Sequence, residues 1–127
     1  MSFNKVMFSS ATDHWSTPKD VYDKLDSEFH FDYDPCPLHG DGGLNSDWGT
    51  ISFVNPPYSD IKKWVEKAYT QWEYGKTVVM LIPSRTDTRW WHDYVMKATE
   101  IRFIKGRLKF GGAKNSAPFP SCIVIFK

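Results

Sequence analysis

The unbroken apolar segment Thr77–Ile82 sets the strongest limit on how this chain folds. It has the length of one β-strand, and an apolar run without alternation is typical of a strand that is buried on both faces. A sheet covered on both faces needs helices on each side, so the segment predicts an α/β fold. With 127 residues, the chain is long enough for one domain with its own core.

Helical and strand patterns alternate on either side of this segment. We expect helices that begin at Thr17-Pro18 (with Thr17 as the N-cap), at Asp60, and at Asp87 and running to Ala98. We expect strands at His30–Tyr33, Ile51–Val54, Thr77–Ile82, Glu100–Ile104, Arg107–Phe110 and Cys122–Phe126. This order predicts a mainly parallel sheet with helices on its faces and a C-terminal antiparallel hairpin.

The remaining composition narrows the class of protein. Residues 1–14 are polar and without period, so they predict a flexible arm ahead of a single domain at residues 15–127. No apolar run approaches the roughly 20 residues of a membrane span, and no leader is recognisable, so we expect a cytoplasmic protein without a membrane partner. Cys36 and Cys122 are expected as free thiols. Cys36 and His39 have a ligand-like gap but no second close pair, so no metal site is predicted.

Charge is divided unevenly along the chain. Residues 1–60 carry three lysines and ten acidic residues, whereas residues 61–127 carry thirteen basic and five acidic residues. An acidic half suits a cationic small ligand, and a basic half suits phosphate. The alternative interpretation is that the two halves neutralise each other across one core.

The tetrapeptide Asn55-Pro56-Pro57-Tyr58 follows one of the expected strands. Two successive prolines fix the backbone and remove two amide donors, so the carbonyl groups stay available to a ligand. Asn55 adds a side-chain acceptor and Tyr58 an aromatic face. This set suits a planar base with an exocyclic amine, whose two hydrogens are held by the acceptors while the ring stacks. The alternative is a rigid strand-to-helix turn against which Tyr58 packs.

Further motifs accompany the tetrapeptide in a fixed order. They are Trp15-Ser16-Thr17-Pro18, Asp34-Pro35-Cys36, the run from Ile82 to Thr88 (IPSRTDT), Trp90-Trp91 and Gly106-Arg107. From about Trp15 to the C-terminus the chain resembles the phage-type DNA N6-adenine methyltransferase family. The resemblance implies an abbreviated Rossmann-like class I methyltransferase sheet, S-adenosylmethionine as methyl donor, no metal, and the N6 amine of adenine in DNA as acceptor.

The resemblance also implies roles for individual residues. The catalytic group is Asn55, Pro56, Pro57 and Tyr58, and the residues that contact the donor are Trp15, Thr17, Pro18, Asp34, Pro35, Cys36 and Asn55. In physical terms, the Asp34 carboxylate suits the ammonium of the donor, and the helix start at Thr17-Pro18 suits its carboxylate. The alternative is that Asp34 is only a turn residue before a proline.

The stretch between the two site motifs is short. Only 21 positions separate Asp34 from Asn55, too few for further strand–helix units that would carry an acidic residue to the ribose of the donor. Asp41 or Asp47 is then left for that role. There is also no room for a separate target-recognition domain, which predicts a short or lax recognition sequence.

The basic half is the expected DNA-binding surface. Its candidate residues are Ser84, Arg85, Thr86, Arg89, Trp90, Lys105 and Arg107. An adenine in a duplex must be flipped out to reach Tyr58, and Trp90 or Phe119 is placed to fill the gap. The alternative is that the tryptophans belong to the core and the arginines form surface ion pairs. Two copies of so short a chain would cover a palindromic site as a homodimer.

The leading hypothesis is therefore an S-adenosylmethionine-dependent, adenine-specific DNA methyltransferase in a bacterial or phage-infected host cell. A cytosine-N4 methyltransferase is the alternative within enzymes, because the tetrapeptide suits either amine. A catalytically silent nucleic-acid-binding module and a metal-stabilised interaction domain are the alternatives outside that class.

Overall fold

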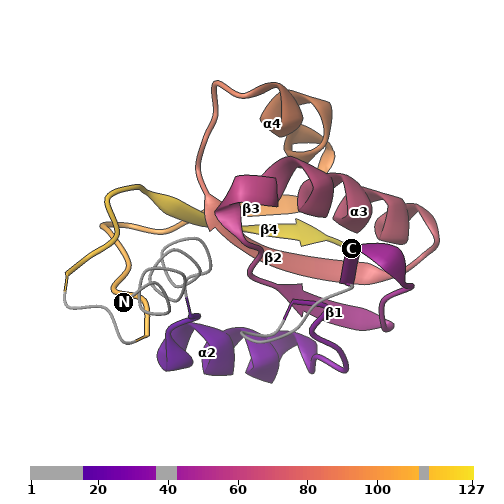
Figure 1. Cartoon of the computed structure of the whole chain (residues 1–127). Helices are drawn as coiled ribbons and strands as arrows, with labels where there is room; N and C mark the ends of the chain where they lie inside the picture. The colour runs from indigo at the N-terminus through magenta and orange to yellow at the C-terminus, as the bar shows by residue number, and fades with distance from the viewer. Residues whose placement is uncertain (1–15, 37–42, 112–114) are drawn as a thin grey trace, which may run out of the picture.

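The computed structural model describes residues 16–36, 43–111 and 115–127. Within these residues four strands form one sheet in the order β1-β2-β4-β3 (Figure 1). The strands are β1 (Ile51–Val54), β2 (Thr77–Pro83), β3 (Glu100–Phe103) and β4 (Ser121–Phe126). β1 pairs with β2 in parallel, and β4 runs antiparallel to both β2 and β3. Three strands therefore point the same way and β4 alone is reversed.

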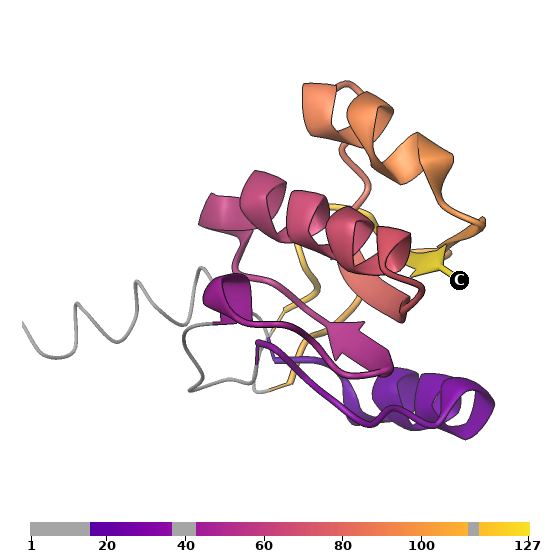
Figure 2. The same ribbon diagram turned by 90° about the vertical axis from the view of Figure 1, so that its right-hand side faces the viewer.

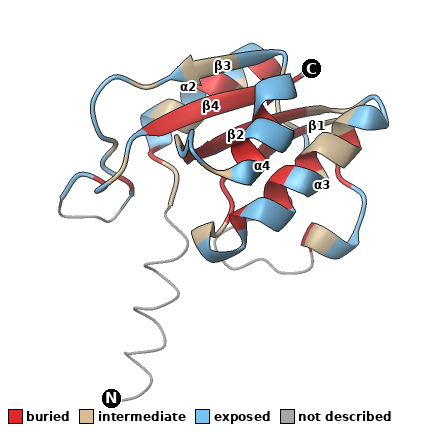
Figure 3. Cartoon of the chain, turned by 90° about the horizontal axis from the view of Figure 1, so that it is seen from above, coloured by how far each residue is buried: buried red, intermediate tan, exposed pale blue. Residues whose placement is uncertain are grey.

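The sheet is mixed, which corrects the expectation of a mainly parallel sheet. The expected antiparallel pair forms from β3 and β4, but β4 lies between β2 and β3 instead of at the margin. Two of the three strand pairings are therefore antiparallel. All six residues of β4 are buried, as is typical of a strand with other elements packed on both of its faces. Edge strand β3 is partly exposed, whereas β2 and β4 are buried along almost their whole length (Figure 3).

Helices cover the two faces of the sheet in separate layers (Figure 2). α2 (Lys19–Phe29) lies on one face, where Leu25 and Phe29 pack with side chains of β1, β2 and β4. α3 (Ile61–Glu73) and α4 (Arg89–Asp93) lie on the other face, and their apolar residues form the second core cluster. The α/β architecture expected from the alternating patterns is confirmed. No helix among the described residues has the length and apolar character to cross a membrane.

Two local expectations around α2 are wrong. The helix begins at Lys19, so Pro18 occupies the N-cap, and no side chain among the described residues caps the helix. At the other end His30 adopts a left-handed conformation with φ of 57° and turns the chain sharply. The expected strand after it is reduced to a single bridge between Tyr33 and Ser52. That bridge is parallel to β1, so this segment still runs alongside the sheet.

Two expectations in the C-terminal half are also corrected. The helix expected from Asp87 to Ala98 is broken at Tyr94, where φ is −126°, into α4 and the 3-10 turn η3 (Val95–Lys97). The segment 107–110 forms no strand. Gly106, with φ of 76°, turns the chain away from β3. The described residues 104–111 and 115–120 lie near the end of the sheet where β1 and β2 finish (Figure 1).

Candidate active site

A cavity of about 360 Å³ opens at the carboxyl end of β1, where the entry to α2 meets the turn after residue 33. This volume lies within the range of small-molecule sites. The cavity is lined by Ser16, Thr17, Lys19, Tyr22, Asp34, Cys36, Phe53 and Asn55. Four of these are residues that the sequence motifs predicted for the donor site, namely Thr17, Asp34, Cys36 and Asn55. The fold thus brings three separate motifs to one place.

Asn55 follows β1 and is only 3% exposed. Its side-chain Nδ2 donates a hydrogen bond to Oγ1 of Thr17 at 3.0 Å. This bond joins the end of β1 to the segment that enters α2, across 38 positions of sequence. The amide of Asn55 is therefore held inside the protein, at the wall of the cavity.

The turn at Asp34 is defined by its own side chain. Oδ1 of Asp34 accepts a hydrogen bond from the backbone N–H of Cys36 at 2.9 Å, while the residue itself is exposed. The returning chain packs closely on this turn, because a Cβ on Gly43 would lie 2.1 Å from the carbonyl oxygen of Pro35. The Asp34 carboxylate is thus held at a fixed position in the wall of the cavity. This position agrees both with a role in the turn and with a role in binding the donor.

The lining of the cavity includes groups of both polarities. Asp34 brings a negative charge. The entry to α2 also lines the cavity, and the first-turn N–H groups of this helix receive no side-chain cap from the described residues. Lys19 is a further lining residue, and its hydrogen bond to Asp23 raises the pKa of its ammonium, which stays charged. A ligand that carries both an ammonium and a carboxylate matches this arrangement.

Tyr58 opens the 3-10 turn η2 (Tyr58–Asp60), directly after the two prolines. Its ring meets the ring of Phe119 edge-on, with centroids 5.1 Å apart. The hydroxyl is buried and has no hydrogen-bond partner among the residues that the structure describes. Burial raises the pKa of this phenol far above its usual value, against an opposing effect of nearby Arg85. Tyr58 is therefore a neutral aromatic group at physiological pH.

Cys122 lies next to this tyrosine, at the start of β4. Burial raises the pKa of its thiol to about 11, although the neighbouring Ser84 hydroxyl lowers it in part. The thiol is therefore protonated and unreactive at neutral pH. Neither cysteine forms a disulfide with the other, as the sequence predicts, and the structure shows that both are buried.

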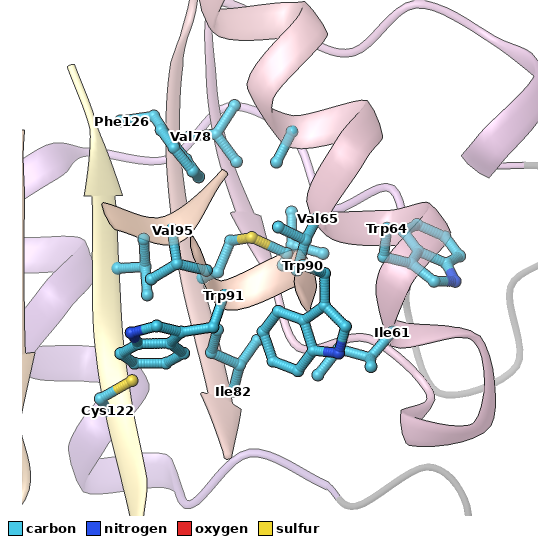
Figure 4. Packing of buried hydrophobic residues seen from close by; sticks show 14 of the residues in the cluster. Ile61, Trp64, Val65, Val78, Ile82, Trp90, Trp91, Val95, Cys122 and Phe126 are labelled. Carbon is cyan, nitrogen blue, oxygen red and sulfur yellow. The ribbon is translucent and has the colours of Figure 1, made fainter. Parts of the chain in front are cut away.

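The structure places Trp90 in the core, whereas the sequence motifs predicted a DNA contact. Trp90 is 8% exposed and Trp91 is 2% exposed. Figure 4 shows the indole of Trp90 beside Ile61 and Ile82, and that of Trp91 beside Cys122. Both tryptophans belong to the core cluster that α3 and α4 form with side chains of β2 and β4. The alternative interpretation, in which the tryptophans belong to the core, is the one that the packing supports.

The other candidate DNA contacts follow β2 and β3 in the chain, near the end of the sheet where the carboxyl ends of β1, β2 and β3 lie. Those that are exposed are Arg85, Thr86, Arg89, Lys105 and Arg107, while Ser84 is half-buried. The backbone N–H of Ser84 donates to the carbonyl of Pro120 at 2.9 Å, which ties the loop after β2 to the connection before β4. The guanidinium of Arg89 lies 3.6 Å from Asp93 and is otherwise exposed. Of these cations, Arg85 is near enough to Tyr58 to affect the pKa of its phenol.

Four positions considered in the sequence analysis are not among the described lining residues of the cavity. Trp15, His39 and Asp41 lie outside the described residues. Asp47 lies beside Gln71, whose Nε2 is 3.4 Å from its Oδ1, away from the lining residues of the cavity. Among the described residues, no three histidine, cysteine or acidic side chains group as a metal site would require.

Four lining residues were not predicted as donor contacts, namely Ser16, Lys19, Tyr22 and Phe53. Lys19 follows Thr17-Pro18 directly. A cation in the first turn of a helix adds to the positive end of the helix dipole, so its position in the sequence could have indicated an anion-binding group. The rings of Tyr22 and Phe53 meet edge-on with centroids 5.2 Å apart. That contact joins a helix to a strand, so only the tertiary structure reveals this apolar wall.

Comparisons with known proteins agree with these motifs. A family model described as DNA N-6-adenine-methyltransferase (Dam) matches residues 5–127. The DNA N-6-adenine-methyltransferase of Haemophilus phage HP1 (strain HP1c1) is 30% identical over 139 residues, covering 93% of this chain and 80% of that protein. The DNA N-6-adenine-methyltransferase of Escherichia phage T1 is 30% identical over 110 residues, covering 76% of this chain and 46% of that protein. No solved structure matches this chain significantly. The chain belongs to the DNA N-6-adenine-methyltransferase (Dam) family.

Proposed function

We propose that this chain binds S-adenosylmethionine in the cavity between α2 and β1, and that Asn55-Pro56-Pro57-Tyr58 presents the N6 amine of a DNA adenine to it. As a member of its family, the chain is an adenine-specific DNA methyltransferase. The observation that carries the assignment of the site is the meeting of Thr17, Asp34 and Asn55 around one cavity at the carboxyl end of a parallel strand.

The lining of the cavity fits the chemistry of this donor. S-adenosylmethionine supplies an electrophilic methyl group on a sulfonium, and it carries an ammonium and a carboxylate at one end. The Asp34 carboxylate binds the ammonium, and the N-terminus of α2 with Lys19 binds the carboxylate. Tyr22 and Phe53 offer an apolar wall to the adenosine. Contacts from the neighbouring positions Trp15, Pro18, Pro35 and Cys36 stay predictions.

Asn55 and the prolines orient the amine of the target base. The side-chain oxygen of Asn55 and the carbonyl of Pro56 accept its two hydrogens. With both hydrogens held, the nitrogen lone pair is kept out of conjugation with the purine ring and attacks the methyl carbon. The carbon–sulfur bond breaks, the neutral thioether leaves, and the methylated amine then loses one proton to water. Asn55 is an amide, so it accepts hydrogen bonds and does not act as a strong base. The neutral ring of Tyr58 stacks on the base.

A duplex target has to be flipped out of the helix to reach this position, at a cost of a few kcal/mol. Phe119 lies against Tyr58 and is half-buried, which places an aromatic ring next to the base site for this step. The exposed cations after β2 and β3 bind the phosphates on either side. Binding of two copies to a palindromic site stays a prediction.

The sheet supports an abbreviated Rossmann-like class I methyltransferase domain over residues 15–127. β1 and β2 are parallel, and the single bridge at Tyr33 adds a third segment that runs the same way. The cavity lies beyond the carboxyl ends of these segments, where open α/β sheets bind their ligands. Action on DNA in the cytoplasm of a bacterial or phage-infected host cell follows from the proposed reaction.

Transfer of isotope from methyl-labelled S-adenosylmethionine tests the reaction directly. The purified chain is incubated with unmethylated duplex DNA, and the DNA is then digested to nucleosides. We expect the label on N6-methyladenine. Label on N4-methylcytosine would contradict the acceptor, and absence of label despite donor binding would support a silent binding module. Absence of donor binding would contradict the assignment of the cavity.

Binding to DNA should depend steeply on salt. If the exposed cations neutralise about four to six phosphates, the logarithm of the binding constant should fall with the logarithm of salt concentration with a slope between about −3.5 and −5.5. Arg85→Ala should reduce the magnitude of this slope by about 1 with little effect on sequence preference. Lys62→Ala, an exposed cation on α3, is the matched control and should leave the slope unchanged. Equal slopes for both variants would remove Arg85 from the interface.

A further inference from the structure

The hydroxyl of Thr17 does not perform the role expected of a threonine before a helix. A threonine at this point commonly caps the first turn, but α2 begins at Lys19 and receives no side-chain cap from the described residues. The Oγ1 of Thr17 instead accepts the hydrogen bond from Nδ2 of Asn55 at 3.0 Å. The hydroxyl is therefore committed to the active-site amide and not to the helix.

This hydrogen bond is made by the nitrogen of the Asn55 side-chain amide and not by its oxygen. A primary amide has a donor end and an acceptor end, and the two point away from each other. Because the nitrogen end of Asn55 faces Thr17, the oxygen end is directed to the other side of the amide. Asn55 is only 3% exposed, so water has little access to hold the amide in a different orientation.

Thr17 is in turn held by the backbone around it. The carbonyl oxygen of Ser16 accepts a hydrogen bond from the N–H of Gly111 at 3.0 Å, and the following Pro18 is buried. A Cβ on Gly111 would lie 3.2 Å from the Cβ of Ser16, so the two segments are in close contact. The hydroxyl therefore sits on a segment that is fixed from both sides, as a positioning group requires.

We infer that Thr17 is a positioning residue for methyl transfer, whose hydroxyl orients the Asn55 amide so that its oxygen accepts a hydrogen of the target amine. The inference rests on the proposed function, because the orientation of the Asn55 amide affects the reaction only if its oxygen accepts a hydrogen of the target amine. It also adds to that function, because the same segment leads into the helix N-terminus proposed to hold the carboxylate of the donor. The entry to α2 thus serves both substrates.

Three threonine variants separate this role from a simple contact with the donor. Thr17→Val removes the hydroxyl at nearly constant shape, and Thr17→Ser keeps it. Thr70→Val is the matched control, because Thr70 lies on α3 with its hydroxyl bonded to the carbonyl of Glu66. With both substrates saturating, we expect Thr17→Val to lower kcat about 10-fold or more, the equivalent of one lost hydrogen bond. Thr17→Ser and Thr70→Val should stay within about 3-fold of the parent enzyme.

Two further readouts are independent of turnover. The affinity for S-adenosylmethionine, measured by calorimetry, should change less than about 3-fold in Thr17→Val, because the hydroxyl that is removed is bonded to Asn55 and the backbone that leads into α2 is kept. In ¹⁵N NMR spectra of the protein without substrates, the side-chain NH₂ signals of Asn55 are identified by their loss in Asn55→Asp. These signals should shift in Thr17→Val and remain nearly in place in Thr17→Ser. Thermal unfolding confirms that each variant is folded.

Different failures are distinguishable. A loss of donor affinity in Thr17→Val with unchanged kcat would make Thr17 a donor contact only and overturn the inference. Unmoved Asn55 signals would show that the hydrogen bond is not formed in solution, with the same consequence. If the parent chain neither binds the donor nor methylates adenine, the proposed function fails even though the NMR signals still report the bond. If Thr17→Val does not fold, Thr17→Ser and slow hydrogen exchange of the Asn55 amide in the parent protein decide whether the bond exists.

Discussion

Asn55→Ala should reduce methyl transfer to adenine by about 100- to 1,000-fold in kcat, the range seen when one preorganised hydrogen-bonding group is removed from a reaction site. The substitution removes the amide oxygen that is proposed to accept a hydrogen of the target amine. It leaves both prolines and Tyr58 in place. The amine would then keep its lone pair in conjugation with the purine and react slowly. Single-turnover rates with labelled S-adenosylmethionine and saturating duplex DNA measure this effect without interference from product release.

The interpretation depends on a folded protein, because Asn55 is buried and bonded to Thr17. Loss of that bond should cost on the order of 1 kcal/mol of unfolding free energy, which thermal unfolding can detect. Asn45→Ala, an exposed asparagine in the 3-10 turn η1 (Gly43–Asn45), is the matched control and should retain full activity. A folded Asn55→Ala protein with nearly full kcat would contradict the proposed mechanism.

The second large effect concerns the donor. Asp34→Asn should weaken the binding of S-adenosylmethionine by about 10- to 100-fold, because a charge-assisted hydrogen bond to the ammonium becomes a neutral one. The amide oxygen of asparagine still accepts the N–H of Cys36, so the turn at this position is retained. The charge is therefore changed with little change of shape. Isothermal titration calorimetry of the purified chain measures the dissociation constant.

A truncated ligand shows whether the effect comes from the amino-acid end of the donor. Methylthioadenosine keeps the adenosine but has neither ammonium nor carboxylate, so its affinity should be the same for the parent chain and for Asp34→Asn. Glu73→Gln, which removes an exposed charge at the end of α3, controls for the overall change in net charge. Equal loss of affinity for both ligands would mean that Asp34 supports the fold of the cavity and does not bind the ammonium.

Much of the secondary structure and the chemistry of the motifs was predictable from local sequence. The unbroken apolar run at Thr77–Ile82 and the tetrapeptide after β1 carry their information within a few neighbouring residues. A backbone period of two or 3.6 residues and two consecutive prolines act over such short distances. For the same reason, the strands β1, β2, β3 and β4 lie close to where the patterns placed them.

The neighbours of each strand were decided only by tertiary structure. The apolar pattern of β4 predicts burial on both faces, but β1 and β2 show similar patterns, and nothing local says which strands become adjacent. β4 lies inside the sheet, where it pairs with β2 on one side and with β3 on the other. The burial of Trp90 and Trp91 was likewise decided by tertiary structure, because helical spacing alone does not reveal that two adjacent side chains are both buried.

The site shows the same division. The sequence by itself determined which chemical groups are available, namely an acidic turn at Asp34, a helix entry at Thr17 and the amide and aromatic ring of the tetrapeptide. The tertiary structure decided that these groups share one cavity and that Asn55 bonds to Thr17 instead of leaving Thr17 to cap α2. The physical reason is that a hydrogen bond across 38 positions depends on how helix, strand and loop pack, and no periodicity or propensity along the chain encodes that packing.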